Sequence, residues 1–265
     1  MSCELVDIGA NLAHHSFDDD RDDVLQRAAD AGVGTLIITG SSDDSNVAAL
    51  NLAEQHKGAL YSTAGVHPHH ASDYSETSDA VIRECIANEQ CVAVGECGLD
   101  YFRMVSPREA QLDAFKAQLD IAVESGHPVF LHQRDAHDDF VDVLEPVLPK
   151  LSRAVAHCFT GESESLREFV AMGLYIGITG WICDERRGTH LKDIVSCVPD
   201  DRLMLETDAP YLLPRTIRPK PKSRRNEPAY LPEVLKTVAE ARGQSEQQVA
   251  EMTTANAKRF FGIRL

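Results

Sequence analysis

The sequence predicts a TIM-type (β/α)₈ barrel, because short buried strands and amphipathic helices alternate along the whole chain. Eight apolar runs recur over 265 residues, and several are continuous stretches of Val, Ile and Leu, as the strands of a parallel sheet require. Helical patterns separate these runs, at a spacing of about 20 to 40 residues from strand to strand. Polar residues follow the runs, where a barrel places its functional groups.

The eight predicted strands follow one another without a linker that would mark a domain boundary. They read LVDIGA from Leu5, TLIITG from Thr35, YSTAGV from Tyr61, CVAVGE from Cys91, PVFLH from Pro128, AVAHCF from Ala154, LYIGITG from Leu174 and LMLETD from Leu203. The alternative is an open doubly wound sheet, but no G-x-G-x-x-G follows the first run, which weakens its dinucleotide-binding version. We expect one barrel domain over residues 1–265.

Two helices carry clear boundary signals. The first covers residues 20–31 and is followed by Gly32, a residue typical of a helix C-terminus. The second covers residues 106–124, with Ser106 at the N-cap, Pro107 in the first turn and Gly126 after the end. These helices separate predicted strands, as the barrel requires.

Composition excludes several classes of protein. The 26 basic and 42 acidic residues give a net charge of −16, which argues against a broad nonspecific grip on nucleic acid. A hydrophobic fraction of 43% excludes a disordered chain. No run approaches the length of a membrane span and the N-terminus does not resemble a signal peptide. Seven cysteines without a C-x-x-C indicate a reducing cytoplasm.

Potential metal ligands end five of the predicted strands. In a barrel the carboxyl ends of all strands meet at one mouth, so these side chains are expected to converge. They are His67, Glu96, His132, His157 and Asp208. Three imidazoles and two carboxylates form the ligand set of a hydrolytic metal site, and a shared cation would satisfy buried polar groups that are otherwise costly. A bridging carboxylate could hold two cations about 3.5–4 Å apart, the spacing used in phosphoryl transfer.

Three assignments at the mouth stay open on the sequence alone. His67 contacts a phosphate, a water or the metal, or it anchors its loop. His69 and His70 are expected in solvent. Arg134 either clamps a phosphate with two parallel hydrogen bonds or pairs with Asp135.

A basic segment follows the last strand. Residues 215–225 read RTIRPKPKSRR and contain no acidic residue. The segment rises from the predicted mouth, so Arg224, Arg225 and their neighbours are expected to bind phosphates of a substrate strand. The alternative is a solvated run of charge. The pair Tyr101-Phe102 or Trp181 could stack on an unpaired base, which would favour single strands, although Trp181 fits a core position equally well.

Longer motifs around these residues resemble one known family. DIGANL, GVHPH, GECGLD, HCFTG, GITGW, ETDAPYLLP and SRRNEPA occur in the same order as in the TatD family of metal-dependent deoxyribonucleases, over nearly the whole chain. The resemblance implies a TIM-barrel hydrolase that acts on DNA, as a 3′→5′ exonuclease. It also implies that Glu96, His132 and His157 bind metal and that Asp208 is a ligand or a catalytic carboxylate.

The end of the first strand departs from most of the wider family, which carries His-x-His there. Gly9 and Asn11 occupy these positions, so one metal site would lose two imidazoles and keep mainly oxygen ligands. Asn11 could contribute its amide oxygen. Oxygen-rich sites suit Mg²⁺, with Mn²⁺ as a substitute, better than Zn²⁺. We therefore expect one or two divalent cations, with Mg²⁺ as the cofactor.

The expected reaction is metal-assisted hydrolysis of phosphodiester bonds, with Asp208 as general base or ligand and Glu96 ordering the metals. The expected substrate is DNA, mainly single-stranded, and also RNA, in DNA repair or degradation. We expect a monomer that does not bind membranes. Two rivals remain: a deacylase acting on aminoacyl-tRNA, which could use the same metal site, and a noncatalytic quality-control or interaction protein.

Overall fold

A computed structural model describes residues 4–263, and it contains the predicted barrel. Eight parallel strands form one sheet in the order of the sequence, from β1 to β8. The strands are β1 (Leu5–Ala10), β2 (Val33–Ile38), β3 (Leu60–Ala64), β4 (Cys91–Asp100), β5 (Val129–Arg134), β6 (Ala154–Ala156), β7 (Tyr175–Ile178) and β8 (Leu203–Leu205). All eight coincide with predicted apolar runs, so the barrel is confirmed and the open sheet is excluded.

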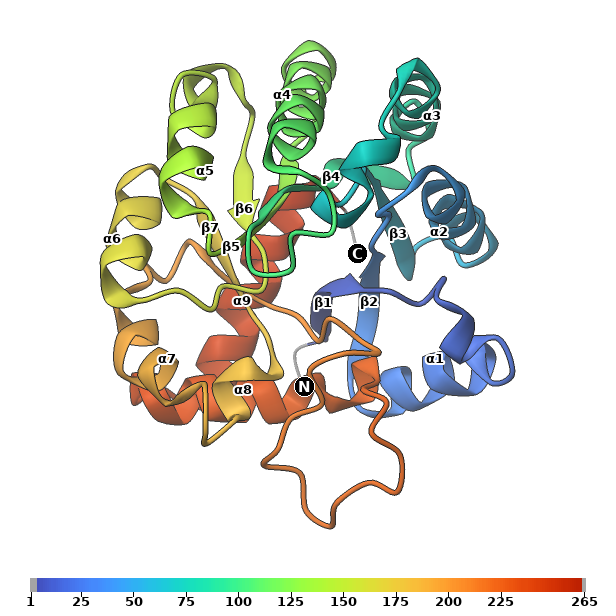
Figure 1. Ribbon diagram of the computed structural model, residues 1–265. Coiled ribbons are helices and arrows are strands. Elements are labelled where there is room, and N and C mark those ends of the chain that lie inside the picture. Colours follow the sequence, from blue (N-terminus) through green and yellow to red (C-terminus); the bar gives the residue numbers. More distant parts are fainter. Residues whose placement is uncertain (1–3, 264–265) are drawn as a thin grey trace.

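Helices follow the strands and surround the barrel (Figure 1). They are α1 (Arg21–Asp30), α2 (Asp43–Gln55), α3 (Glu76–Ile86), α4 (Arg108–Ser125), α5 (His137–Leu144), α6 (Ser163–Ala171), α7 (Thr189–Ile194), α8 (Leu231–Arg242) and α9 (Glu246–Phe261). A short 3₁₀ helix, η2 (Pro68–Asp73), follows β3, and another, η4 (Gly180–Cys183), follows β7. The helices shield the outer face of the sheet from water, which is why its strands are apolar on both faces.

The barrel closes between its first and last strands. Ala10 and Ala209 form a parallel bridge, and the Asn11 amide donates to the Ala209 carbonyl at 2.7 Å. Fully buried Asp7 accepts hydrogen bonds from the amide and the hydroxyl of Thr207, at 2.9 and 2.5 Å. Burial raises the pKa of Asp7 to about 7. The seam therefore depends on a few polar contacts that join the two ends of the sheet.

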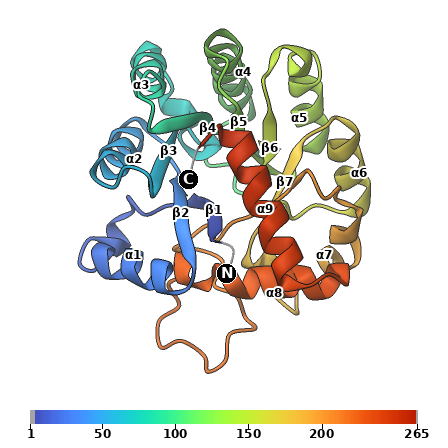
Figure 2. The ribbon, with the colours of Figure 1, turned by 180° about the vertical axis from the view of Figure 1, so that it is seen from behind.

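The last described helix, α9, lies across the end of the barrel opposite the mouth (Figure 2). Thr254 on α9 donates to the Glu4 carbonyl just before β1, at 3.0 Å. Asn256 donates to the Leu203 carbonyl on β8, at 2.8 Å. Phe260 packs edge-on against Tyr175 at the base of the barrel, with ring centroids 5.1 Å apart. This end is therefore closed by apolar packing, and the opposite mouth is left for the polar strand ends.

Two local expectations need correction. The sixth and eighth strands end earlier than the apolar runs, at Ala156 and Leu205, so His157 and Asp208 lie just beyond them. Ser106 was expected to cap α4, but the N-cap is Pro107 without a side-chain hydrogen bond. The Ser106 hydroxyl donates instead to the His69 carbonyl, at 3.0 Å. The serine thus connects the loop before α4 to the loop after β3.

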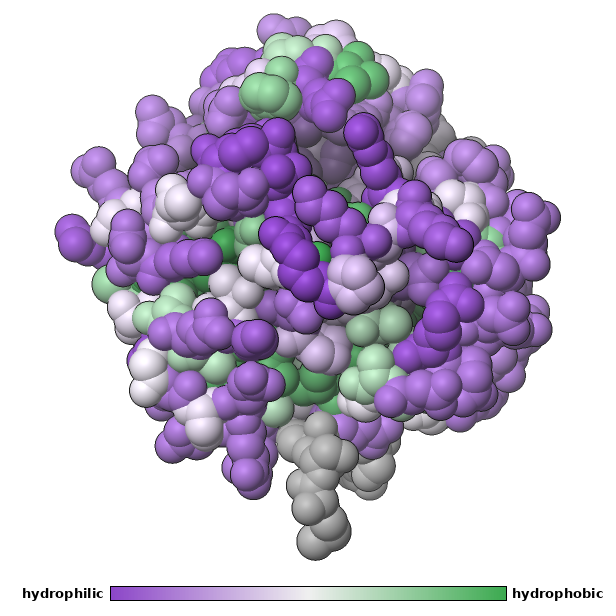
Figure 3. All heavy atoms as spheres, turned by 90° about the horizontal axis from the view of Figure 1, so that it is seen from below, coloured by the Kyte–Doolittle hydropathy of each residue, from purple (hydrophilic) through white to green (hydrophobic). Residues whose placement is uncertain are grey.

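The outer surface is mainly hydrophilic on the face shown in Figure 3, where hydrophobic side chains occur in small groups between polar ones. This is the ordinary pattern of a surface that faces water. In the part of the chain that the structure describes, no helix is both long and apolar enough to cross a membrane.

Candidate metal and catalytic centre

Glu96 forms the centre of the mouth. It is the sixth residue of β4 and lies among histidines from three other strand ends. Its Oε1 lies 2.7 Å from His157 Nε2, 3.0 Å from His132 Nδ1 and 3.4 Å from His67 Nε2. We call these four residues the mouth cluster. They are four of the five residues that the sequence predicted to converge. His67, whose role the sequence left open, faces the same oxygen as the other two histidines.

A second carboxylate, Glu206, holds His157 from behind. Its side chain is fully buried, with Oε2 at 3.3 Å from His157 Nδ1. Its Oε1 accepts a hydrogen bond from the Cys158 amide at 2.5 Å. The contact between Glu206 and Nδ1 of His157 leaves Nε2 of this ring facing Glu96. A carboxylate behind a metal-binding histidine is a common way to fix the ring and its tautomer.

The space for Glu206 explains the departure at the end of the first strand. A Cβ atom at Gly9 would lie 2.6 Å from Glu206 Oε2, and one at Gly177 would lie 2.3 Å from Oε1. Both distances are shorter than van der Waals contact, so side chains at these positions would displace the carboxylate. Gly9 therefore provides room for Glu206, and an imidazole at this position is incompatible with the observed arrangement.

Asp100, the last residue of β4, supports the other side of the mouth cluster. Its Oδ2 lies 2.8 Å from His69 Nε2 and 3.5 Å from His132 Nε2. The longer distance leaves the buried His132 Nε2 without a full hydrogen bond. The nearby His132, the hydrogen bond to His69 and the one from the Arg103 amide together outweigh burial and hold the pKa of Asp100 well below its usual range. His69 was expected in solvent, and this prediction was wrong because the loop after β3 folds back onto β4.

Asp208 lies at the seam of the barrel, next to the cluster. Its Oδ1 accepts a hydrogen bond from Asn11 Nδ2 at 3.1 Å, and its φ of 55° is one that Asp tolerates better than most residues. Burial is the main cause that raises the pKa of Asp208 to about 7, and Glu96 and Glu206 add to it. Asp208 therefore shares the electrostatic environment of the mouth cluster. Asn11 uses its amide nitrogen here, which directs its oxygen away from Asp208.

The donor atoms of the mouth cluster fit a cation. One atom from each of His67, Glu96 and His132 lies within 4.8 Å of the other two, a separation that ligands of one ion can have. Burial opposes charge in the cluster, yet Glu96 and Glu206 raise the pKa of His157 well above its usual range. His157 and His67 hold the pKa of Glu96 well below its own. A divalent cation would supply the positive charge that protonated imidazoles otherwise provide.

The basic segment, which we call the basic loop (residues 215–225), divides into paired and unpaired cations. Arg225 Nη2 lies 2.7 Å from Asp20 Oδ2 and 2.9 Å from Glu227 Oε1. Arg215 pairs with Glu185 at 2.8 Å. Arg224 is exposed, as are Lys220 and Lys222, and these three have no ion pair among residues 4–263.

Arg134 lies between two aromatic rings. Its guanidinium carbon is 4.4 Å from the centre of the Phe102 ring and 5.0 Å from that of Trp181. Arg187 covers Trp181 as well, at 4.2 Å. Phe102 is 56% exposed, whereas Trp181 is 9% exposed and is covered by these two cations. Trp181 therefore belongs to the wall of the mouth, and Phe102 is the more accessible of these two rings. The alternative pair of Arg134 with Asp135 is not formed.

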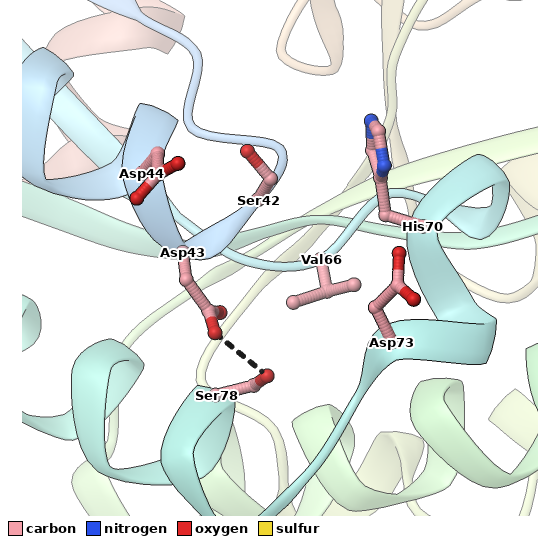
Figure 4. A pocket seen from close by; sticks show the side chains of 7 residues that line it. All are labelled: Ser42, Asp43, Asp44, Val66, His70, Asp73 and Ser78. Carbon is pink, nitrogen blue, oxygen red and sulfur yellow. Dashed lines mark hydrogen bonds between the residues drawn. The ribbon is translucent and has the colours of Figure 1, made fainter.

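A separate pocket of about 280 Å³ lies beside the mouth cluster, between the start of α2, η2 and α3. Figure 4 shows Asp43 and Asp73 facing it from two sides, with His70 at its edge. Asp43 Oδ2 accepts a hydrogen bond from the Ser78 hydroxyl at 3.0 Å. His70 is exposed, as the sequence predicted. The pocket does not include any residue of the mouth cluster.

Comparison with known proteins identifies the family. A sequence model described as TatD-related DNase matches residues 6–262. The chain belongs to this family. It is 51% identical over 259 residues to a protein of Erwinia tasmaniensis named 3′-5′ ssDNA/RNA exonuclease TatD, covering 98% of this chain and 100% of that protein. A protein of Shigella flexneri with the same name is also 51% identical, with 98% and 99% covered.

Solved structures agree with this assignment. A TatD homologue of Escherichia coli superimposes with a TM-score of 0.90 and 30% identity, covering 100% of both chains. A TatD family hydrolase of Entamoeba histolytica has a TM-score of 0.88 at 24% identity, covering 98% of this chain and 99% of that one, and shows the shared fold. The resemblance seen in the motifs is thus confirmed, and the chain is a hydrolase of the nuclease class.

Sequence reasoning missed Glu206 and Asp100 as partners of the histidines. Both lie inside motifs that were recognised, ETDAP and GECGLD. The available signal was that each of these two motifs contains a second carboxylate near the ligand candidate. A charge with no exposure, as at Glu206, indicates a fixed partner.

Proposed function

We propose that this chain is an Mg²⁺-dependent exonuclease that removes nucleotides from the 3′ end of single-stranded DNA and RNA. The observation that carries the proposal is the convergence of three imidazole nitrogens within 3.4 Å of one oxygen of Glu96. Relatives that are 51% identical over nearly their whole length bear the name 3′-5′ ssDNA/RNA exonuclease. The mouth of the barrel is where such an enzyme would bind the end of a strand.

Glu96, His132, His157 and His67 would hold the cation, and Asp208 would complete the site. A divalent cation acts as a Lewis acid on a phosphoryl oxygen and makes water a stronger nucleophile at neutral pH. Glu206 and Asp100 keep the rings of His157 and His132 in place. Asp208, whose pKa burial raises to about 7, can accept a proton from the attacking water at its free carboxylate oxygen.

The substrate strand would be bound by cations that the protein leaves without carboxylate partners. Arg134 lies two residues beyond His132, and its guanidinium lies between the rings of Phe102 and Trp181. Arg224, Lys220 and Lys222 of the basic loop are exposed and can contact phosphates further along the strand. Arg225, predicted as a substrate contact, uses its guanidinium to hold Asp20 and Glu227. We therefore assign phosphate binding in the basic loop to Arg224 and its lysine neighbours.

Labelled oligonucleotides test this function. A single strand labelled at its 5′ end should shorten stepwise from the 3′ end in Mg²⁺, and EDTA should stop the reaction until Mg²⁺ or Mn²⁺ is restored. Circular single-stranded DNA should remain intact, because it has no end. Failure to shorten the strand in either metal would overturn the proposal. Release of the amino acid from aminoacyl-tRNA would favour the deacylase instead.

We infer that the reaction takes place in the cytoplasm. The described cysteines are free thiols, which fits work in the reducing cytoplasm. Removal of nucleotides from 3′ ends fits a role in DNA repair or degradation. We propose that the whole chain acts as one domain and as a monomer.

A further inference from the structure

Four side chains at the mouth form a row in which aromatic rings and guanidinium groups alternate. The row runs from Phe102, after β4, to Arg134 at the end of β5, then to Trp181 in η4 and to Arg187 beyond it. Each neighbouring pair is 4.2–5.0 Å apart, measured from guanidinium carbon to ring centre. Such distances allow cation–π attraction at every step. We call these residues the stacked row.

The stacked row is anchored at one end and open at the other. Trp181 donates its indole N–H to the Arg187 carbonyl at 3.3 Å, and Arg187 is held by Asp184 at 3.1 Å. Phe102 is 56% exposed, although phenylalanine has no polar group that gains from water. Arg134 covers part of the ring at 4.4 Å from its centre, and the Arg103 guanidinium carbon lies 5.9 Å from the same centre. More than half of the Phe102 side chain still faces solvent. An anchored row whose aromatic end is largely exposed has room for one more flat group.

The position of the row indicates what that group is. Phe102 lies two residues after Asp100, and Arg134 lies two residues after His132, so the open end of the row adjoins the mouth cluster. The loop between β4 and α4, which carries Phe102, lies over the barrel in Figure 1. We therefore expect a nucleotide bound at the cluster to place its base near this loop. Arg134 has no carboxylate partner among residues 4–263, so its N–H groups are available to the attached phosphate.

We propose that Phe102 is the stacking platform for one unpaired nucleobase of the substrate strand, with Arg134 binding the phosphate beside it. This inference rests on the proposed nuclease function and adds a subsite for the base. A base in a duplex has both faces covered by its neighbours, so stacking on Phe102 requires an unstacked, single-stranded end. The platform thereby favours single strands without reading their sequence, because every base has a π face.

Steady-state kinetics on single-stranded oligonucleotides test the platform. Phe102→Ala should raise KM by about 5- to 100-fold, the range for loss of one base–aromatic stack, and should change kcat little. Phe102→Tyr should keep the parent KM, and Phe102→Leu should not, because leucine is apolar but has no π system. Val105→Ala is the matched control, since Val105 is on the same loop and 62% exposed but lies outside the row. An unchanged KM in Phe102→Ala, or full rescue by leucine, would overturn the proposal.

Abasic substrates locate the base. Removal of one base at a particular position near the 3′ end should raise KM for the parent protein and have no further effect on Phe102→Ala. Equal sensitivity of both proteins to that abasic position would show that the base does not contact Phe102. Sedimentation adds a second control: if Phe102→Ala dissociates a dimer and leaves KM unchanged, the ring is a contact between two copies and the platform is wrong.

Binding in EDTA separates this inference from the proposed function. Fluorescence anisotropy with a labelled oligonucleotide measures affinity without hydrolysis. If the parent protein binds the strand but cleaves nothing in Mg²⁺ or Mn²⁺, the exonuclease proposal fails, and weaker binding by Phe102→Ala still supports the platform. If the parent cleaves normally and both proteins bind and cleave alike, the platform fails alone. Absence of both binding and cleavage in the parent overturns both.

Discussion

The mouth cluster and the basic loop lie at the same end of the barrel, but they differ in how their charged side chains are paired within the protein. In the cluster, Glu96 faces three histidines. Glu206 contacts the other nitrogen of His157, and Asp100 lies near the other nitrogen of His132, so both carboxylates support the arrangement around Glu96. In the basic loop, Arg225 is held by two carboxylates of the protein, whereas Arg224 is exposed and unpaired in the described structure. A charge near the mouth is therefore available to substrate only if the fold has not already given it a partner.

The largest effect should come from Glu96→Gln. The amide keeps the shape of the side chain but removes the negative oxygen to which the three histidines point. We expect kcat to fall by about three powers of ten, since such electrostatic contributions are usually the largest in catalysis. The measurement is the hydrolysis rate of a single-stranded oligonucleotide in saturating Mg²⁺. Glu84→Gln, on the exposed face of α3, is the control, and activity near the parent level in Glu96→Gln would remove Glu96 from the centre.

Asp100→Asn should have the next largest effect. The amide is the same size but supports His132 Nε2 and His69 Nε2 less strongly than a carboxylate does. A fall of about 10- to 100-fold in activity is expected, together with a higher Mg²⁺ requirement, as for other residues that orient metal-binding histidines. A Mg²⁺ titration of the rate distinguishes positioning from simple loss of folding. An unchanged Mg²⁺ requirement would show that Asp100 does not support the cluster.

Gly9→Ala tests the space reserved for Glu206. The added Cβ would lie 2.6 Å from Glu206 Oε2, and overpacking of this kind costs about 1–3 kcal/mol of unfolding free energy. Urea denaturation of Gly9→Ala, Glu206→Asp and the double variant measures the coupling, because the shorter aspartate should relieve part of the clash. Strictly additive effects in this cycle would mean that Gly9 and Glu206 do not compete for space.

Arg225→Ala and Arg224→Ala should differ in kind. Arg225 is partly buried between Asp20 and Glu227, so its removal should cost about 1–2 kcal/mol of stability. Arg224→Ala should leave stability unchanged and should lower the salt dependence of strand binding, with the slope reduced by about 0.7 for the lost phosphate contact. Urea melts and anisotropy titrations at several salt concentrations check both. If both variants changed stability and salt dependence in the same way, the distinction between paired and unpaired arginines in the basic loop would be wrong.

The smallest effect concerns pH. Hydrogen bonding to Arg225 is the main cause that lowers the pKa of Asp20 from 3.8 to about 2. A carboxylate with a lowered pKa in the folded state contributes stability above its unfolded pKa and loses it as pH falls. The stability difference between the parent and Arg225→Ala should thus be constant above about pH 4 and shrink as pH falls toward 2. Urea melts across this range measure it, and a difference that is independent of pH would exclude the Asp20 pair as its source.

The sequence was sufficient to predict the barrel because its strands are buried on both faces. Continuous apolar runs such as LVDIGA and TLIITG are typical of such strands. It was also sufficient to bring Glu96, His132 and His157 to one mouth, because parallel strands share their carboxyl end. It was insufficient for Arg225, whose partner Asp20 is 205 positions away and sits just before α1. Nor could it show that Gly9 is small to make room for Glu206, since that contact exists only after β1 and β8 meet.

Helix α9 has a consequence for the synthesis of the protein. It ties the residue before β1 to the first residue of β8 through Thr254 and Asn256, and at the opposite end of the barrel the seam joins Asn11 to Asp208. A chain still emerging from the ribosome has made β1 long before these partners exist. The free edge of β1 therefore stays without its partner until the residues of β8 and Ala209 have been synthesised. We therefore expect the seam at the mouth to form late in folding, and a chain that ends before β8 lacks both the closed barrel and Asp208.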